Sequence, residues 1–214
     1  VAGATTITFD LTGYGGVGSF HSYQSPGLTL ETFGAVHSNG VITSTARLGQ
    51  WSTGLGIQSN NDYSHLVDGD GPDEMVLFAF SQAVSLERVS FSYFDSADDA
   101  EIATYSFDGQ TTTLTELKSN IDILTDQCSG SCNNRSNDYG FTDVASLDLG
   151  ESLVFGVGSN HWSDQFKINS VTVRYQTPVS NTPPAVPLPA GIWLLLGGLG
   201  GLAAVSRFRR NQSA

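Results

Sequence analysis

The sequence predicts an all-β ectodomain, a jelly-roll-like antiparallel β-sandwich, followed by one C-terminal transmembrane helix. Segments rich in β-branched and aromatic residues alternate with clusters of Gly, Asn, Asp and Ser, as in sandwiches and barrels. Long helices are disfavoured, because Ala, Leu, Glu and Lys are scarce before the C-terminal tail. The transmembrane helix is expected over residues 186–205, which carry no charge.

Six segments show the alternation of apolar and polar residues that strands require. They are residues 6–11, 74–80, 85–95, 100–107, 152–157 and 166–175. Residues 74–80 are apolar on both faces, with Met75, Leu77 and Ala79 on one face and Val76, Phe78 and Phe80 on the other. A strand that buries both faces lies inside a fold. We therefore expect residues 74–80 to form a central strand.

The chain divides into four parts. Residues 1–4 contain the small-x-small pattern of a signal-peptidase site and are expected to be a signal-peptide remnant. Residues 5–176 form the ectodomain, and residues 177–185 are a linker rich in Pro, Ser and Thr. Residues 186–214 contain the uncharged span, about 30 Å long as a helix, and end in a basic tail with Arg207, Arg209 and Arg210. By the positive-inside rule, the arginines stop transfer and the ectodomain faces outward.

Five residues at the start of the last part carry a specific resemblance: Val186, Pro187, Leu188, Pro189 and Ala190. Followed by an apolar Gly-rich span and an arginine cluster, this box resembles the PEP-CTERM sorting signal in its VPLPA variant. The resemblance implies that an exosortase, a membrane enzyme of Gram-negative bacteria, is a partner. It further implies export across the inner membrane, a transient membrane anchor, cleavage, and transfer to the cell surface or an exopolysaccharide matrix.

Charge excludes one large class of function. The formal net charge is −12, and because all acidic residues precede residue 165, residues 1–184 carry −15. Phosphate backbones are bound by clustered Lys and Arg, so nucleic acid is not expected as a partner.

Two cysteines, Cys128 and Cys132, flank Ser-Gly-Ser. Redox or metal chemistry is one interpretation of the pair. Zinc needs two further ligands at defined spacing, and redox motifs normally have two residues between the cysteines. In an exported chain we favour a disulfide that shapes a polar surface loop.

Residues 51–74 are predicted to form one long acidic loop between strands. Five carboxylates within thirteen positions repel one another unless something neutralises them. Oxygen ligands on a Gly-rich loop are typical of Ca²⁺, although the spacing is not that of an EF-hand. The candidate ligands are these five together with one acid before the last strand: Asp62, Asp68, Asp70, Asp73, Glu74 and Asp164. Asp10 is a further candidate by fold-level analogy. The alternative is a solvated acidic loop without a metal.

No catalytic residues are predicted. Residues 13–18 match G-x-G-x-x-G, but no helix pattern follows, so we interpret them as a turn and not as a dinucleotide site. The four histidines are scattered, and no pair of carboxylates stands out as a glycosidase site. We therefore expect a non-enzymatic surface or matrix protein. The block over residues 54–80 loosely resembles ectodomains of PEP-CTERM surface proteins. This resemblance implies a jelly-roll-like surface domain without known catalysis.

The alternative is a carbohydrate-binding module or glycan-active enzyme on the same scaffold. Trp51, Tyr63 and Trp162 lie in or beside expected loops, where aromatic rings can stack on sugars. It is equally consistent with the sequence that these rings close the ends of the sandwich.

Overall fold

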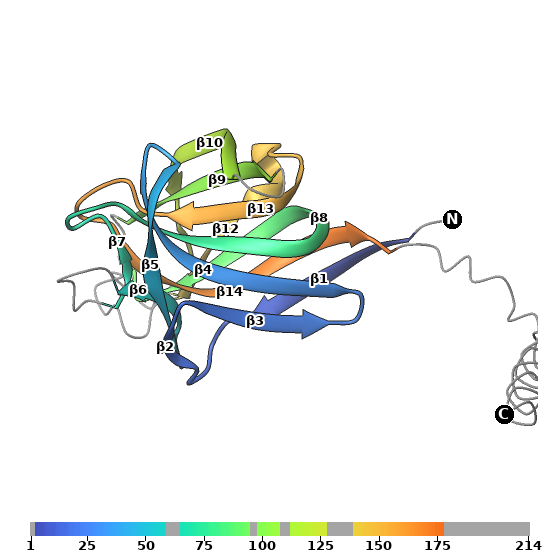
Figure 1. Ribbon diagram of the computed structural model, residues 1–214, viewed down its shortest axis with the longest axis horizontal. Helices are drawn as coiled ribbons and strands as arrows, with labels where there is room; N and C mark the ends of the chain where they lie inside the picture. The colour runs from blue at the N-terminus through green and yellow to red at the C-terminus, as the bar shows by residue number, and fades with distance from the viewer. Residues whose placement is uncertain (1–2, 59–64, 95–97, 108–111, 128–138, 178–214) are drawn as a thin grey trace, which may run out of the picture. The chain divides into compact units, whose positions relative to one another are not determined.

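The computed structural model describes residues 3–58, 65–94, 98–107, 112–127 and 139–177. Within these ranges the chain forms β-strands and a single short 3-10 helix (Figure 1). In chain order they are β1 (Ala4–Asp10), β2 (Gly16–Gly18), β3 (Phe20–Ser25), β4 (Leu28–Ser38), β5 (Val41–Trp51), β6 (Gly54–Gln58), β7 (Val67–Asp68), β8 (Glu74–Ser92), β9 (Asp99–Phe107), β10 (Thr112–Asp122), β11 (Leu124–Gln127), β12 (Tyr139–Asp143), η1 (Val144–Leu147), β13 (Glu151–Gly158) and β14 (Gln165–Gln176). The all-β prediction is confirmed.

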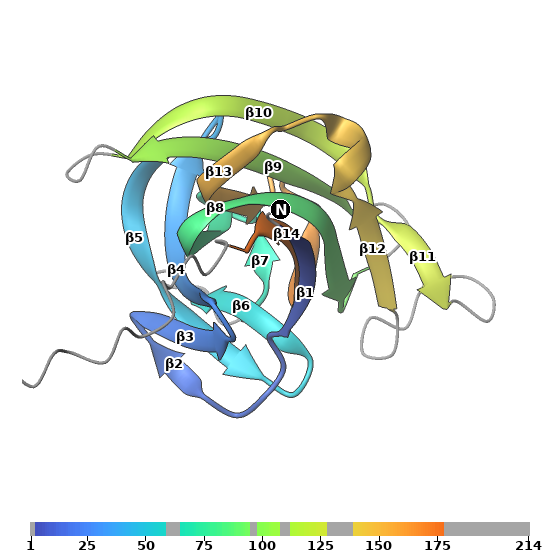
Figure 2. The ribbon, with the colours of Figure 1, turned by 90° about the vertical axis from the view of Figure 1, so that its right-hand side faces the viewer.

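Five antiparallel strands close into a barrel. The order is β14, β6, β5, β4 and β8, and β8 pairs back onto β14 to complete the ring (Figure 2). Closure leaves these strands without open edges. We expected two separate packed sheets. The described strands instead follow one continuous hydrogen-bonded path, on which β13, β9 and β10 extend outward from β8.

The long strand β8 explains this single path. Its first half pairs with β4, for example Ala35 with Met75, and its second half pairs with β14, for example Val89 with Val171. The register between β8 and β13 shifts between Ser152 and Val154, which marks a bulge. Bulges bend a strand and increase its twist, so one strand can serve two layers. The two strands predicted over residues 74–80 and 85–95 are therefore one element.

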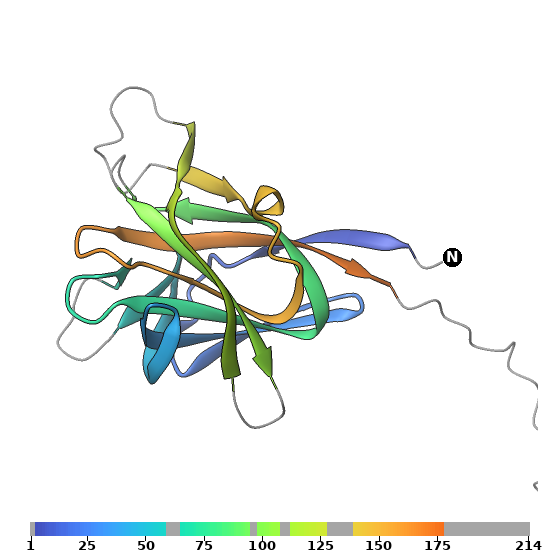
Figure 3. The same ribbon diagram turned by 90° about the horizontal axis from the view of Figure 1, so that it is seen from above.

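Two apolar clusters fill the fold. The larger joins residues of the barrel strands with residues of β9 and β13, and it includes Val76, Phe78 and Phe80. The smaller contains Met75 and Tyr105 and lies on the opposite face of β8. The first half of β8 is thus apolar on both faces and has a neighbouring strand on each side, which confirms its predicted central position. Figure 3 shows the β9–β10 hairpin crossing the barrel strands.

The two ends of this body differ. At one end the start of β1 pairs with the end of β14, Ala4 opposite Gln176 (Figure 1). At the other end β4 turns into β5 through Asn39 and Gly40, both with positive φ. Asn-Gly is the preferred sequence for such a two-residue hairpin turn. The candidate site lies at this second end.

Candidate functional site

The end of the molecule that contains the Asn39–Gly40 turn collects carboxylates from several strands. Here β4, β10 and β13 end, while β8, β9 and β14 begin. Antiparallel pairing places their terminal residues side by side: Gly158 is opposite Glu101, and Asp122 is opposite Asp99. We call the following residues the acidic end: Asp68, Glu74, Asp98, Asp99, Glu101, Asp122 and Asp164. Five of them are at most 3% exposed, namely Asp68, Glu74, Asp98, Glu101 and Asp164.

The predicted acidic loop is not a single loop, because β6 and β7 form within it. This is a correction with a steric cause. A Cβ at Gly56 would lie 2.0 Å from the His65 carbonyl oxygen, so glycine is needed where β6 meets the chain before β7. The glycines that indicated a loop therefore permit close strand packing.

The structure brings some of the predicted metal ligands together and separates others. The backbone N–H of Asp68 donates to Glu74 Oε2 over 3.3 Å, and the N–H of Asp70 donates to Asp68 Oδ1 over 3.2 Å. The Asp70 side chain itself is exposed. Asp73 is half-buried, and its carbonyl accepts from the His37 N–H. Asp62 lies outside the described residues.

Asp164 joins this group through the pairing of β7 with β14. Gln165 is opposite Asp68, and the Gly69 N–H donates to the Asp164 carbonyl over 3.4 Å. Asp10 does not join them, because it is opposite Ser170. Six residues along β14 separate Ser170 from Asp164, which is roughly 20 Å of strand. The fold thus places Asp164, the predicted ligand outside the loop, beside Gly69 at the end of β7.

The Asp164 carboxylate is buried and only half satisfied. Its Oδ1 accepts from the Asp99 N–H over 3.3 Å, whereas its Oδ2 has no hydrogen-bond partner among the described residues. Burial raises the pKa of Asp164 to about 6, and the negative charge of Asp99 adds to this effect. An ionised carboxylate in this position is costly unless a cation or a proton compensates it.

Asp99 and Asp122 form a pair of like-charged side chains beside Asp164. They lie directly opposite each other on β9 and β10. Burial raises the pKa of Asp99, and both the charge and the contact of Asp122 raise it further. Two carboxylates in contact favour a shared proton or a bound cation.

A cation at the acidic end would need further ligands from the backbone or from water. Within the described ranges, no three side chains of the His, Cys, Asp and Glu types come close enough to hold a metal ion by themselves. Ca²⁺ accepts carboxylates, backbone carbonyls and waters among its six to eight oxygen ligands. Asp164 with its unpartnered Oδ2 is the residue best placed to be one of them.

Several site residues were not found from the sequence. Asp98, Asp99, Glu101 and Asp122 were not proposed as ligands, although Asp98 and Asp99 directly precede a predicted strand. One sequence signal could have identified them: acidic residues recur at the ends of the predicted strands. Antiparallel pairing places these strand ends side by side. His37 was also missed; it is buried beside Glu101, with 3.4 Å between Nδ1 and Oε1.

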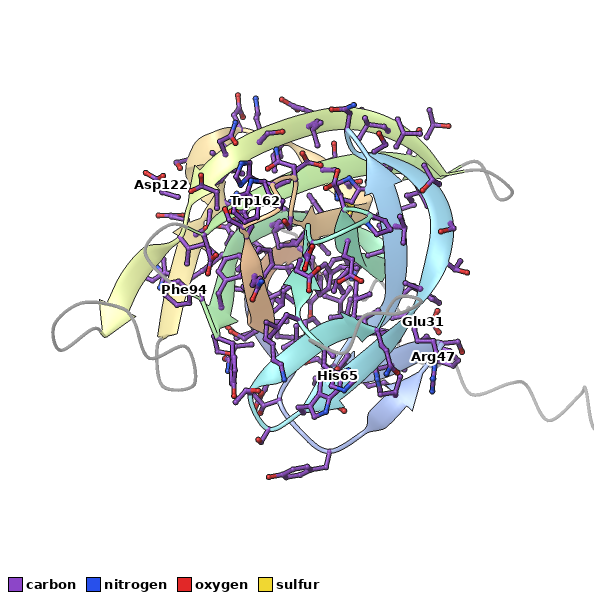
Figure 4. The ribbon with its side chains drawn as sticks, turned by 90° about the vertical axis from the view of Figure 1, so that its left-hand side faces the viewer. Glu31, Arg47, His65, Phe94, Asp122 and Trp162 are labelled. Carbon is purple, nitrogen blue, oxygen red and sulfur yellow. The ribbon has the colours of Figure 1, made fainter. Side chains whose placement is uncertain are left out.

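The aromatic residues proposed for sugar stacking differ in exposure. Trp51 is half-buried and contacts the His65 ring and the Lys167 ammonium, with 5.2 Å between the ring centroids and 4.3 Å from Nζ to the indole centroid. Trp51 is therefore already engaged in contacts within the protein. Trp162 is 71% exposed and lies two residues before Asp164 (Figure 4). Tyr63 lies outside the described residues.

The other predicted features fall outside the described residues. They are Cys128 and Cys132, the Val186–Ala190 box and the arginines of the tail. The part of the chain that the structure describes contains no helix long and apolar enough to cross a membrane. No family model, no curated protein and no solved structure matches this chain.

Proposed function

We propose that this chain is an exported, non-catalytic surface or matrix protein whose acidic end binds Ca²⁺. The observation that carries the calcium proposal is the buried Asp164 carboxylate, which has an unpartnered Oδ2 and a neighbouring Asp99–Asp122 pair. The raised pKa values of Asp99 and Asp164 support it, because burial and neighbouring negative charge disfavour their ionised forms and a bound cation would offset that cost.

Processing and location form the second part of the proposal. The Val186–Ala190 box, the apolar span and the arginine cluster support recognition by an exosortase and delivery to the cell surface or an exopolysaccharide layer. The jelly-roll-like architecture expected from the sequence is part of the same proposal. A long bent strand that serves two layers, as β8 does, is one way in which the sheets of such folds are joined.

Thermal unfolding of the full chain in mild detergent tests the calcium site. A ligand that binds only the native state at a hundred times its Kd adds about 2.7 kcal/mol of stability. For a domain of this size, we expect millimolar Ca²⁺ to raise the Tm by about 5 to 10 °C relative to EGTA. Asp164→Asn and Asp122→Asn should each remove most of that increase.

A matched control separates a specific site from general charge effects. Asp148 is an exposed acid after η1, and its positive φ of 52° is one that asparagine adopts well. Asp148→Asn should keep the full response to Ca²⁺. Equal responses in wild type, Asp164→Asn and Asp148→Asn would rule out the proposed site and leave the acidic end as an electrostatic feature without a metal.

A further inference from the structure

A groove lies where the strand that pairs with one edge of β4 changes from β5 to β3. β4 pairs with β5 from Ser38 back to Gly34, and with β3 from Phe33 back to Leu28. At the junction of the two pairings, β5 diverges from β4 toward its other partners, β2 and β6. A cavity of about 680 Å³ opens between the diverging strands. Its lining includes Phe20, Phe33, Ser44, Thr45, Arg47 and Gln58, and we call it the β4–β5 groove.

Arg47 differs from the other basic side chains that the structure describes. Two of these are ion-paired, Lys118 with Glu116 at 2.8 Å and Arg174 with Glu87 at 2.9 Å. Two lie over aromatic rings, namely Arg88 and Lys167. Arg47 is exposed, and among the described residues it makes neither kind of contact. In a protein with excess negative charge, a guanidinium without an acidic partner in a groove indicates an external anion as its partner.

The groove also offers an aromatic surface and hydroxyl groups. Phe20 is 51% exposed, and its ring centroid lies 6.0 Å from that of Phe33. An exposed phenyl ring can pack against the apolar face of a sugar ring. Ser44, Thr45 and Gln58 also line the groove, and their polar groups provide donors and acceptors for sugar hydroxyls.

We propose that the β4–β5 groove binds a carboxylate-bearing polysaccharide of the uronate type. Arg47 would hold a sugar carboxylate, Phe20 would pack on the adjacent ring, and Ser44, Thr45 and Gln58 would bind its hydroxyls. A planar carboxylate matches the two-pronged geometry of a guanidinium. This proposal names the matrix component that the proposed surface protein would contact, and in that respect it rests on the proposed function.

The groove and the acidic end can be tested independently. Figure 4 shows Arg47 on the opposite side of the view from Asp122 and Trp162. We would titrate the full chain in mild detergent with a galacturonate hexamer in EGTA and follow binding by calorimetry. The comparison ligand is the carboxyl-reduced, neutral hexamer of the same linkage. The acidic hexamer should bind at least tenfold more tightly than the neutral one.

Variants assign the binding to the groove. Arg47→Gln should weaken binding of the acidic hexamer at least tenfold, and Phe20→Ser should weaken binding of both hexamers. Arg88→Gln removes the same charge from an exposed arginine outside the groove and should leave binding unchanged. Each variant is first shown to keep the wild-type Tm, so that lost binding is not lost folding.

Three results would overturn the groove proposal. They are absence of binding by the wild type, equal binding by wild type and Arg47→Gln, and loss of binding in Trp162→Ala with full binding in Phe20→Ser. The last would place the saccharide at the acidic end. Each leaves the Ca²⁺-dependent melting shift intact, whereas absence of that shift with normal hexamer binding would remove the calcium site alone.

Discussion

His37 and Glu101 form a fully buried pair in which Nδ1 lies 3.4 Å from Oε1. The other ring nitrogen, Nε2, lies 3.0 Å from the Ser159 carbonyl oxygen and must donate to it. Nδ1 accepts from the Gly40 N–H over 3.2 Å and so carries no hydrogen in that arrangement. Nδ1 and an ionised Glu101 would both be acceptors, and a proton on the carboxyl group relieves this conflict. Burial raises the pKa of Glu101, which favours that protonated form.

This pair predicts how stability depends on pH. A carboxyl whose pKa is higher in the folded than in the unfolded state stabilises the fold fully below the unfolded pKa. That contribution is lost as pH rises through the folded pKa. We expect Glu101→Gln, which keeps a hydrogen-bond donor, to flatten the decrease in unfolding free energy above pH 4.5. Urea unfolding between pH 4.5 and 8 measures this pH dependence. If the unfolding free energy decreased equally with pH in the variant and in the wild type, the prediction would be contradicted.

His37→Ala should be far more costly than Glu101→Gln. It leaves the Gly40 N–H and the Ser159 carbonyl without their partners inside the protein and opens a cavity. We expect a loss of about 2 to 4 kcal/mol in unfolding free energy at pH 7. Urea unfolding of His37→Ala beside His21→Ala provides the comparison. His21 is only half-buried, and its ring makes a longer hydrogen bond, 3.3 Å, to the Leu48 carbonyl. If both variants lost the same unfolding free energy, the buried His37–Glu101 pair would not stabilise the fold more than the half-buried His21 does.

The stabilisation by Ca²⁺ should itself depend on pH. Without the metal, the contribution of Asp164 is fully present below pH 4 and is lost as pH approaches about 6, its pKa in the folded state. Ca²⁺ requires the ionised carboxylate, so protons compete with it in this range. The Tm increase caused by Ca²⁺ should therefore be small at pH 4.5 and full at pH 7.5. A constant increase from pH 4.5 to 7.5 would exclude Asp164 as a ligand.

Gly69 fixes the distance between β7 and the loop before Asp164. A Cβ at this position would lie 2.3 Å from the His161 carbonyl oxygen, which is backbone and cannot rotate away. Gly69→Ala should cost about 1 to 3 kcal/mol of unfolding free energy and weaken the Tm response to Ca²⁺. In Gly3→Ala the nearest atom would be the Thr177 Oγ1 at 3.6 Å, an ordinary contact, so this control should change neither quantity. Wild-type behaviour of Gly69→Ala would contradict the steric argument.

The strands whose alternation is strong were predictable from the sequence. Residues 100–107, 152–157 and 166–175 correspond to β9, β13 and β14 within one residue at each end. The apolar character of both faces of residues 74–80 placed that segment at the centre. Closure of the barrel was not predictable in the same way. It depends on a bulge beside β8 and on pairing between β8 and β14, and neither leaves a local sequence pattern.

The candidate site could be predicted only in part for the same reason. Asp68 and Glu74 are close in sequence, and composition alone drew attention to them. Asp99 and Asp122 are separated by a hairpin, and their contact depends on the register of β9 and β10, which contains two irregularities. A register shift of one residue would move each side chain to the opposite face. Sequence patterns therefore could not predict this contact, because they do not specify the register between distant strands.

Lys167 provides a last test of the structure that requires neither calcium nor saccharide. The side chain is 7% exposed, and its Nζ lies 4.3 Å from the Trp51 ring centroid and 5.2 Å from that of Tyr93. Burial lowers the pKa of Lys167 to about 8. A lysine with a lowered pKa contributes stability that is present above its unfolded pKa, about 10.4, and is lost as pH falls through 8.

Lys167→Met should therefore stabilise the protein at neutral pH, because methionine fills the space without a charge to desolvate. We expect a gain of about 1 kcal/mol at pH 6.5 that shrinks by pH 10, measured by urea unfolding at both values. The aromatic contacts limit the gain, since a cation over two rings recovers part of its desolvation cost. Lys118→Met, at an exposed ion pair, should show no comparable change with pH. A loss of stability in Lys167→Met at pH 6.5 would mean that the ring contacts outweigh burial, and that Trp51 holds this lysine in its charged form.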